Sequence, residues 1–485
     1  MSVSSHDFDR FTRVVGARLG LAVDGTRAAH AEEVLVERAK RCGGTVASYV
    51  AALERGASAD EWGALAQGLT VRETYFFRHR DQFDALCEVA LPARAERRIP
   101  GGALRILSAG CASGEEAYSL AIAARGVAGP WSGVEVVGLD VVSAALEKAR
   151  RGRYTRWALR DVDENMEARW FRRDGAEHVL ADEIVRAVRF EEHNLASELR
   201  ETLRGSFDVV FCRNVLMYLL PDVARMVVAG LARALAPGGY LFLGHAETLR
   251  GLSTAFHLRS THETFYYQLR DDGDDLELEP PPPPDAPPVD GGWADAIFRA
   301  SHRVRHLAEV QHAKTDTGDP IDRARDLLRE ERFAQALAVL HDAPDARASV
   351  DPEVLILRAV LQTHHGDITA AEQTCGDILA VDDLHAGARY VLALCREAQG
   401  QLGLAADLDR AAIHLDPTFA MPHLHLGLMA RRSGDADTAR RALERAASLL
   451  AGEDPARLLL FGGGFGRDAL VALCRAELRA LEASR

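Results

Sequence analysis

A run of acidic residues followed by prolines divides this chain of 485 residues. The run spans residues 271–290 and reads DDGDDLELEPPPPPDAPPVD, a composition that cannot bury a hydrophobic core. Consecutive prolines favour the extended polyproline conformation, so we expect an acidic, proline-rich linker over residues 271–320. A single core also stops growing at about 250–300 residues. The sequence therefore predicts separate domains on the two sides of the linker.

The overall composition limits which class of partner the protein can bind and in which cellular compartment it is expected. A net charge of −14 argues against a nucleic-acid partner that is held by phosphate contacts. The chain has no apolar run of about 18 residues, and its N-terminus lacks a basic region followed by an apolar stretch, so we expect neither membrane insertion nor secretion. Seven scattered cysteines without a C-x-x-C pair favour a reducing compartment. The sequence thus predicts a cytoplasmic protein with no metal site.

Before the linker, two patterns follow one another. Residues 1–92 carry apolar side chains at helical spacing and are expected to form a helical domain. Residues 93–270 alternate strands with helices, which predicts an α/β fold with a doubly wound, Rossmann-like parallel sheet. Ligands of such sheets bind outside the carboxyl ends of the strands. The expected strands are 103–110, 134–140, 188–195, 207–214 and 239–246, with helices starting near Glu115, Ser143 and Pro221.

After the linker, small residues recur every 34 positions. The recurring sets are Gly366, Gly400 and Gly434; Ala371, Ala405 and Ala439; and Ala359, Ala393 and Gly427. This is the period of the tetratricopeptide repeat (TPR), in which small residues allow two helices to cross closely. Residues 321–485 are therefore expected to form an all-α solenoid that ends in a capping helix and binds an unidentified protein partner in its groove. The repeat units are expected at 351–384, 385–418 and 419–452.

The loop after the first strand has the features of a cofactor site. It runs from Gly110 to Glu116 as GCASGEE, and its small residues allow a ligand to approach the backbone. The spacing is not G-x-G-x-x-G, and two carboxylates in the first helical turn would repel a pyrophosphate. They suit S-adenosylmethionine (SAM), which carries a sulfonium and an ammonium group. Stabilisation of the helix dipole explains Glu115 well but Glu116 only in part.

Further polar residues stand at the ends of expected strands. Asp140 ends the second strand, where an acid accepts hydrogen bonds from ribose hydroxyls, although an ordinary helix N-cap is the alternative. Asn194-Leu195 and Arg213-Asn214 end later strands and would line the same crevice, or they simply form turns.

With these residues, the chain resembles the CheR-type chemotaxis receptor methyltransferases, which are SAM-dependent protein-glutamate O-methyltransferases. The resemblance extends from the N-terminus to about Leu269. The combination of T-x-F-F-R, S-G-E-E and F-C-R-N-V-x-x-Y elements in this order is highly specific. The matching segments are ETYFFR (73–78), SAGCASGEEAYSLAI (108–122), LDVVSAALEKARRGRY (139–154), FCRNVLMYL (211–219) and GGYLFLGHAETL (238–249).

The resemblance implies a role for each matching position. Thr74 and Arg78 match residues at the SAM and active-site end, Glu116 matches an acidic cofactor contact, and Asp140 matches the ribose ligand. Tyr218 matches an aromatic residue near the methyl-transfer site. Arg78 would hold the incoming carboxylate, and Tyr218 would orient it or shield the sulfonium. The remaining cofactor contacts that the resemblance implies are Asn194, Leu195, Arg213 and Asn214.

The implied reaction converts glutamates on the cytoplasmic helical bundle of a chemoreceptor to γ-glutamyl methyl esters and releases S-adenosylhomocysteine (SAH). A glutamate carboxylate is already ionised at neutral pH and needs no general base, so His245 and Cys212 are expected to be structural. Where the family often has Asn, this chain has Arg72, which puts one cofactor contact in doubt and could instead reach an acidic substrate.

The resemblance also implies a small antiparallel β-subdomain at about residues 167–190. Its turn at residues 173–177 is short, so we expect no tethering to a receptor C-terminal peptide. The segment Glu37–Arg41 is either a basic face for an acidic receptor or a solvated helix surface. Two rival readings stay open: a non-catalytic SAM-binding or TPR scaffold protein, and a SAM enzyme that acts on a small molecule or nucleic acid.

Overall fold

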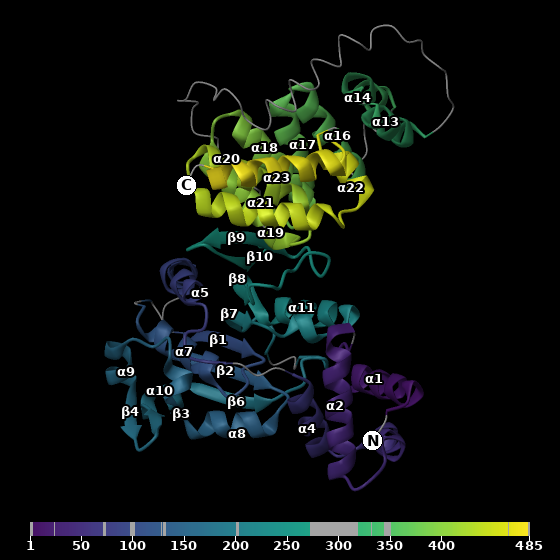
Figure 1. Ribbon diagram of the computed structural model, residues 1–485. Coiled ribbons are helices and arrows are strands. Elements are labelled where there is room, and N and C mark those ends of the chain that lie inside the picture. The colour runs from purple at the N-terminus through teal and green to yellow at the C-terminus, as the bar shows by residue number, and fades with distance from the viewer. Residues whose placement is uncertain are drawn as a thin grey trace. The chain divides into compact units, whose positions relative to one another are not determined.

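The computed structural model describes most of two compact units, Met1–Asp274 and Asp275–Arg485. Figure 1 shows both as ribbons. The linker predicted at 271–320 lies almost wholly outside the described residues, as does Arg72. The described residues are 3–271 and 319–483, apart from gaps at 24, 71–73, 98–101, 128, 130–131, 200–202, 331, 344–350 and 464.

The first unit is built on a seven-stranded sheet with the order β6-β2-β1-β7-β8-β10-β9. The first five strands in that order are parallel, and β10 pairs antiparallel with both β8 and β9. The predicted doubly wound sheet is confirmed, with all five expected strands present. The strands are β1 Leu104–Ala109, β2 Val134–Asp140, β6 Val188–Glu192, β7 Phe207–Cys212, β8 Leu235–Leu243, β9 Phe256–Thr261 and β10 Thr264–Leu269.

The hairpin of β9 and β10 was not among the expected strands. Its turn holds His262 and Glu263 at φ 51° and 56°, a conformation in which glycine or asparagine is the usual signal. Because that signal is missing, the sequence FHLRSTHETFYYQL does not predict the hairpin turn that the structure contains.

Helices cover both faces of the sheet, as Figure 1 shows. α11 begins with Pro221 as its first residue, where a missing N–H costs nothing. Residues 80–96 continue through α5, a short π-helix and α6, and their apolar side chains join the core of the sheet. The helices around the sheet are α5 Arg80–Ala85, α6 Leu91–Glu96, α7 Glu115–Arg125, α8 Ser143–Arg151 and α11 Pro221–Ala234.

A second, three-stranded antiparallel sheet with the order β3-β5-β4 lies between α8 and β6 in the chain. This is the small β insertion that the resemblance implied, and its first strand comes earlier than residue 167. Gly175, at φ 62°, forms the short turn between the last two strands. The elements of this insertion are β3 Arg153–Thr155, α9 Glu164–Trp170, β4 Phe171–Asp174, β5 Glu177–Leu180 and α10 Asp182–Arg186.

Four helices precede the sheet and share a core of their own. Phe11, Val15 and Leu35 are fully buried in it, and Val142, the N-cap of α8, and Ala145 in its first turn join the same cluster. The start of α8 therefore ties these helices to the sheet. The helical domain expected at residues 1–92 is thus present, and its fourth helix, α4, has few large apolar residues but begins with a serine N-cap. The helices are α1 Ser5–Leu19, α2 Gly25–Arg41, α3 Val46–Gly56 and α4 Ala59–Leu69.

The second unit is helical and repeats with the predicted period. Gly366, Gly400 and Gly434 all have positive φ and each follows the first helix of a pair, so these recurring glycines form the turns between paired helices. A Cβ on Gly427 would lie 2.8 Å from Leu443 Cγ, so the small residue is needed where the helices cross. The pairs are α16 Pro352–His365 with α17 Ile368–Val381, α18 Ala386–Ala398 with α19 Leu402–Leu415, and α20 Ala420–Arg432 with α21 Ala436–Leu450.

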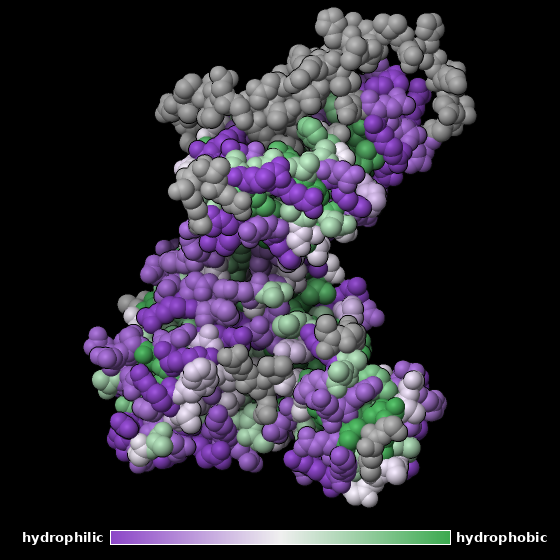
Figure 2. Space-filling model, in the orientation of Figure 1, coloured by the Kyte–Doolittle hydropathy of each residue, from purple (hydrophilic) through white to green (hydrophobic). Residues whose placement is uncertain are grey.

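Less regular helices flank the three pairs. The last of them, α23, packs against α21 and lies where the capping helix was predicted. None of the helices in the described ranges is long and apolar enough to cross a membrane. Figure 2 shows that hydrophilic residues dominate the visible face of the sheet-containing part. The flanking helices are α13 Pro320–Arg329, α14 Phe333–Asp342, α22 Pro455–Phe461 and α23 Arg467–Ala483.

Candidate active site

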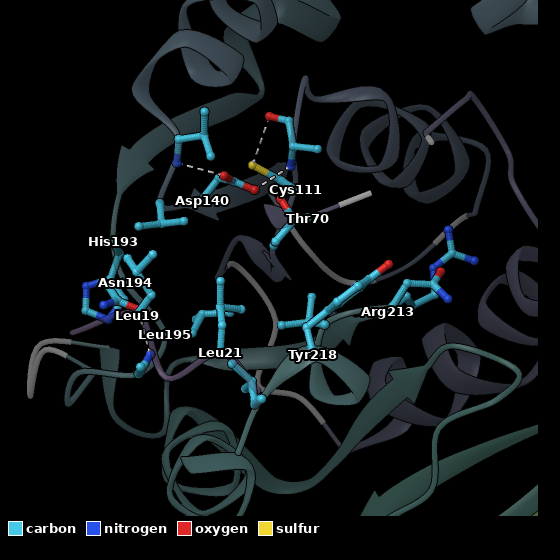
Figure 3. Close-up of a pocket in the computed structure, with 18 of the residues that line it drawn as sticks. Leu19, Leu21, Thr70, Cys111, Asp140, His193, Asn194, Leu195, Arg213 and Tyr218 are labelled. Atoms are coloured by element: carbon cyan, nitrogen blue, oxygen red, sulfur yellow. Dashed lines mark hydrogen bonds between the residues drawn. The ribbon is translucent and has the colours of Figure 1, made fainter. Parts of the chain in front are cut away.

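A pocket lies at the carboxyl ends of β1, β2 and β7, and it brings together every residue that the sequence singled out for the site. Figure 3 shows Asp140 and His193–Leu195 at one side of this pocket and Arg213 with Tyr218 at the other. Its walls also include apolar side chains from the N-terminal helices. The predicted residues that line the pocket are Thr74, Arg78, Glu116, Asp140, Asn194, Leu195, Arg213, Asn214 and Tyr218.

The loop between β1 and α7 has the shape that its small residues predicted. Gly110 and Gly114 have φ of 84° and 92°, and a Cβ on Gly110 would lie 2.4 Å from Val215 Cγ2. Ala112 also has a positive φ of 47°, which is uncommon for a residue with a Cβ. Such strain clusters at functional sites, and here it exposes backbone to the pocket.

Asp140 is held firmly at the end of β2. Its Oδ2 accepts a hydrogen bond of 2.8 Å from Ala112 N, and its Oδ1 accepts one of 2.9 Å from Val142 N. It is not the N-cap of α8, because that position belongs to Val142. A carboxylate oxygen can accept more than one hydrogen bond, and Asp140 lines the pocket, so these backbone contacts are compatible with a ligand contact. The same side chain thus shapes the loop and faces the pocket.

The two neighbouring carboxylates of α7 have different surroundings, as the sequence suggested. Glu115 is 1% exposed, accepts hydrogen bonds from Ser113 Oγ and lies 3.7 Å from Lys148 Nζ. Burial raises the pKa of Glu115, although Ser113 and Lys148 oppose that rise. Glu116 instead lines the pocket, and its Oε1 accepts from Ser108 Oγ at 2.8 Å.

Arg213 makes its hydrogen bonds within the protein. Its Nε donates to Glu116 Oε2 at 2.7 Å, and its Nη1 donates to Arg78 O at 2.7 Å and to Gln82 Oε1 at 2.8 Å. Gln82 in turn donates to Leu243 O at 2.7 Å. Arg213 therefore lies at the pocket wall and orients two other site residues, rather than projecting freely toward a ligand.

The backbone that carries Arg78 is strained on both sides. Phe77 and His79 have φ of 57° and 60°, and neither is glycine. Burial, together with the charges of His245, Arg213 and Arg78, lowers the pKa of His79 to about 4. The Arg78 guanidinium lies 5.9 Å from the ring centroid of Tyr75. This rigid segment places Arg78 and Thr74 along one wall of the pocket.

Asn194 and Asn214 are held by structural contacts while they line the pocket. Asn194 Nδ2 donates to Arg18 O at 2.9 Å, and its Oδ1 accepts from Ala196 N at 3.0 Å, so it links α1 to the segment after β6. Asn214 has a positive φ of 58°, for which asparagine is one of the tolerated residues. These residues therefore form turns, as the alternative interpretation expected, and they also line the pocket.

Sequence reasoning missed the carboxylate that organises the loop after β7. Glu247 is 4% exposed and accepts hydrogen bonds from Asn214 N at 2.6 Å, Val215 N at 2.8 Å and Gly244 N at 2.8 Å. It also accepts from Met217 N at 3.2 Å. Four backbone donors on one buried carboxylate fix the loop that leads directly to Tyr218.

The N-terminal helices also hold Tyr218. Leu21 and Leu219 form an antiparallel bridge, and Ala22 N donates to Tyr218 O at 2.8 Å. The Arg27 guanidinium of α2 lies 4.6 Å from the centroid of the Tyr218 ring, and its Nη2 donates to Met217 O at 2.7 Å. No motif pointed to Arg27, because its partners are about 190 positions away in the chain.

Cys212 and His245 were expected to be structural. Cys212 is fully buried in β7, and burial raises the pKa of its thiol well above the usual value. His245 lies outside the residues that line the pocket, with its Nε2 at 3.1 Å from Asp81 Oδ2.

Comparison with known proteins agrees with this site. Residues 72–265 match the family described as CheR methyltransferase, SAM binding domain. The probable biofilm formation methyltransferase WspC of Pseudomonas putida is 28% identical over 440 residues, which cover 90% of this chain and 97% of that protein. Among solved structures, PcrH in complex with the chaperone binding region of PopD matches at a TM-score of 0.24 and 23% identity, over 27% of this chain and 91% of PcrH.

Two further relatives match about half of this chain. The chemotaxis protein methyltransferase of Escherichia coli is 30% identical over 277 residues, covering 56% of this chain and 93% of that protein. Chemotaxis protein methyltransferase 2 of Vibrio cholerae is 31% identical over 275 residues, covering 55% of this chain and 94% of that protein. Because nearly the whole length of these enzymes is matched at this identity, the chain belongs to the CheR family of SAM-binding methyltransferases.

Proposed function

We propose that the chain methylates glutamate side chains on the cytoplasmic helical bundle of a bacterial chemoreceptor, in chemosensory adaptation. The observation that carries this proposal is one pocket lined by Glu116, Asp140, Arg78 and Tyr218 together. The two carboxylates attract a cationic cofactor, and the Arg78 guanidinium attracts an anionic acceptor. The names of the relatives from Vibrio and Escherichia support the chemosensory setting.

The pocket fits SAM by its own chemistry. Asp140 lines the pocket at the end of β2, where ribose hydroxyls would bind, and Glu116 faces the space where a cationic group would lie. Leu19, Leu21 and Leu195 supply apolar walls. Gly110 also lines the pocket, and its missing Cβ leaves room for Val215, another lining residue. Bound SAM supplies a methyl group on a sulfonium, and transfer to a carboxylate oxygen gives a methyl ester and SAH.

The residues of the chain would contribute by position rather than by proton transfer. A glutamate carboxylate is anionic at pH 7 and attacks without a base. Arg78 would orient that carboxylate through charge-assisted hydrogen bonds, and Tyr218 would place its ring against the reacting groups. Arg213 and Glu247 would keep both in place through their buried contacts. Exclusion of water from the pocket would strengthen each of these interactions.

The test is methyl transfer from labelled SAM by the full chain to membranes that contain a candidate receptor. The expected product is a base-labile methyl ester on receptor glutamates. Base-stable label, or label on small acids with none on any receptor, would contradict the proposal and favour a small-molecule enzyme. SAH binding without transfer to any acceptor would favour the non-catalytic scaffold.

We further propose that the helical repeat docks or regulates a protein partner. A hollow between α14 and α16 is lined by the apolar Leu337 and Leu340, by Arg358 and by the acidic Asp342 and Asp367, which suits a segment with an apolar side chain and charges of both signs. No tether to a receptor C-terminal peptide is expected, because the turn at Gly175 is short.

This second proposal is tested with Arg358→Glu in the full chain. A higher KM for the receptor at unchanged SAH affinity would assign the repeat to recruitment, and a higher rate would assign it to inhibition. Arg410→Glu serves as the control, because Arg410 is exposed, pairs with Asp407 and does not line the hollow. Kinetics identical to the unmodified chain would refute a role for the hollow.

A further inference from the structure

Two imidazoles and a carboxylate meet beside the pocket without lining it. His79, Asp81 and His245 each offer one ligand atom, and these atoms all lie within 4.8 Å of one another. His79 precedes α5, Asp81 lies in its first turn, and His245 follows β8. None of the three lines the pocket, and the proposed methyl transfer uses none of them.

Their arrangement is held from both sides. His245 Nε2 lies 3.1 Å from Asp81 Oδ2, and the rings of His79 and His245 have centroids 4.0 Å apart with planes inclined by 31°. His79 adopts a left-handed φ of 60°, a strained conformation for a residue with a Cβ. The imidazole of His79 is therefore held beside the other two groups by a strained backbone conformation. The His245 and Asp81 side chains are 46% and 28% exposed, so ions and water can reach them.

We propose that His79, Asp81 and His245 bind a divalent transition-metal ion, for which zinc is the best match. Two imidazole nitrogens and one carboxylate oxygen form a ligand set typical of zinc, whereas calcium and magnesium prefer oxygen ligands alone. Three protein ligands leave a coordination position for water, as in other open zinc sites. Zinc–ligand distances of about 2.0–2.2 Å require the three groups to draw together slightly, which their exposure permits.

The affinity is expected to be below that of a closed, four-ligand zinc site. The guanidinium groups of Arg78 and Arg213 act on His79 with like charge and oppose a cation. A bound ion would nevertheless join two segments of the site. One carries Arg78, and the other carries Glu247, which fixes the backbone at Asn214. The effect on methyl transfer rests on the proposed function, whereas metal binding itself does not.

The test uses the tag-free full chain titrated with zinc chloride by calorimetry, and with cobalt(II) as a coloured probe. One equivalent is expected per chain. His79→Asn removes the imidazole and keeps a residue that tolerates positive φ, so it should weaken zinc binding at least about tenfold. Asp81→Asn should weaken it as well. SAH affinity in both variants shows that the pocket is still folded.

His262→Asn is the matched control. His262 also has a positive φ, 51°, and its Nε2 lies 3.0 Å from Glu88 Oε2, but among the described residues it belongs to no group of three ligands. Zinc affinity should be unchanged in this variant. Absence of zinc binding, undiminished binding in His79→Asn, or an equal loss in His262→Asn would overturn the proposal. Because no methyl acceptor is present, these results are independent of the outcome of the methyl-transfer assay.

Discussion

Arg213 donates from Nε to Oε2 of Glu116 over 2.7 Å, and the two side chains are only 3% and 12% exposed. The pair joins the segment after β7 to the first turn of α7, and both residues line the pocket. Glu116 can therefore face a cationic ligand only in the orientation that Arg213 sets. The resemblance implied that both contact the cofactor; the structure adds a positioning role for Arg213.

Arg213→Leu should destabilise the first unit strongly. The change leaves Glu116 buried without its cation and removes hydrogen bonds to Arg78 O and Gln82. Loss of one partner from a buried ion pair costs about 3–5 kcal/mol, to be measured by urea unfolding of the full chain. Arg225→Leu is the control, because its pair with Asp222 is exposed and contributes at most about 1 kcal/mol. Equal stability of the two variants would show that the buried pair is dispensable.

Asp140 should dominate cofactor affinity. Asp140→Asn removes the charge while keeping one acceptor, so SAH should bind about 10- to 100-fold more weakly in calorimetry, as expected for a lost charged hydrogen bond. Asp140→Ala should abolish binding, because the loop at Ala112 also loses its anchor. Asp174→Asn, in the exposed turn of the small sheet, should bind normally. Unchanged affinity in Asp140→Asn would rule out the ribose role.

Arg78→Ala should separate binding from turnover. Arg78 would contact the acceptor rather than the cofactor's ribose end, so SAH affinity should remain within about threefold while methyl transfer falls about 10- to 100-fold. Arg80→Ala is the control, because Arg80 lies two positions away and pairs with Asp163 at the surface. Full activity in Arg78→Ala would disprove its role as the substrate clamp.

Arg27 should act through Tyr218. Its guanidinium covers the Tyr218 ring at 4.6 Å, an interaction worth about 0.5–1 kcal/mol, and it also fixes Met217 O. Arg27→Ala should lower kcat about three- to tenfold without changing SAH affinity. In a Tyr218→Leu background, which lacks the ring, the further loss of Arg27 should matter much less. Additive effects of the two changes would contradict this coupling.

Much of the fold was predictable because its signals are local. The alternation of apolar strands with helices, the loop GCASGEE and the 34-residue spacing can each be read from the sequence pattern without knowledge of distant contacts. Each corresponds to an observed element. Asp140 was recognisable because strand ends of a parallel sheet converge on one edge.

The contacts that sequence reasoning missed are long-range or lack a turn signal. Glu247 accepts hydrogen bonds from backbone donors 30 to 33 positions away, and the sequence around Glu247 does not predict these partners. Arg27 meets Met217 across 190 positions. The β9–β10 hairpin turns at His262 and Glu263 with positive φ, where tertiary contacts override the usual residue preference. Such partners become visible only when the elements are packed together.

The helical second unit contains a buried cluster of charged side chains that should respond to pH. His425 Nδ1 lies 2.7 Å from Asp409 Oδ2, and its Nε2 lies 3.0 Å from Glu397 Oε2. Burial would lower the pKa of His425, but Asp409 and Glu397 outweigh it and raise the pKa to about 9. Burial would raise the pKa of Glu397, but His425 and Arg432 lower it to about 2.

The sign of the effect follows from these directions. Because the folded-state pKa of His425 exceeds its ordinary value of 6.5, its stabilisation is complete below pH 6.5 and is lost as the pH rises through about 9. The loss should be on the order of 3 kcal/mol, since one pKa unit corresponds to about 1.4 kcal/mol. Hydrogen exchange of α18–α20 in the full chain, corrected for intrinsic rates, should increase between pH 7 and 9.5. His425→Gln should exchange faster at pH 7 and lose this pH dependence, whereas the same dependence in that variant would assign it to other groups.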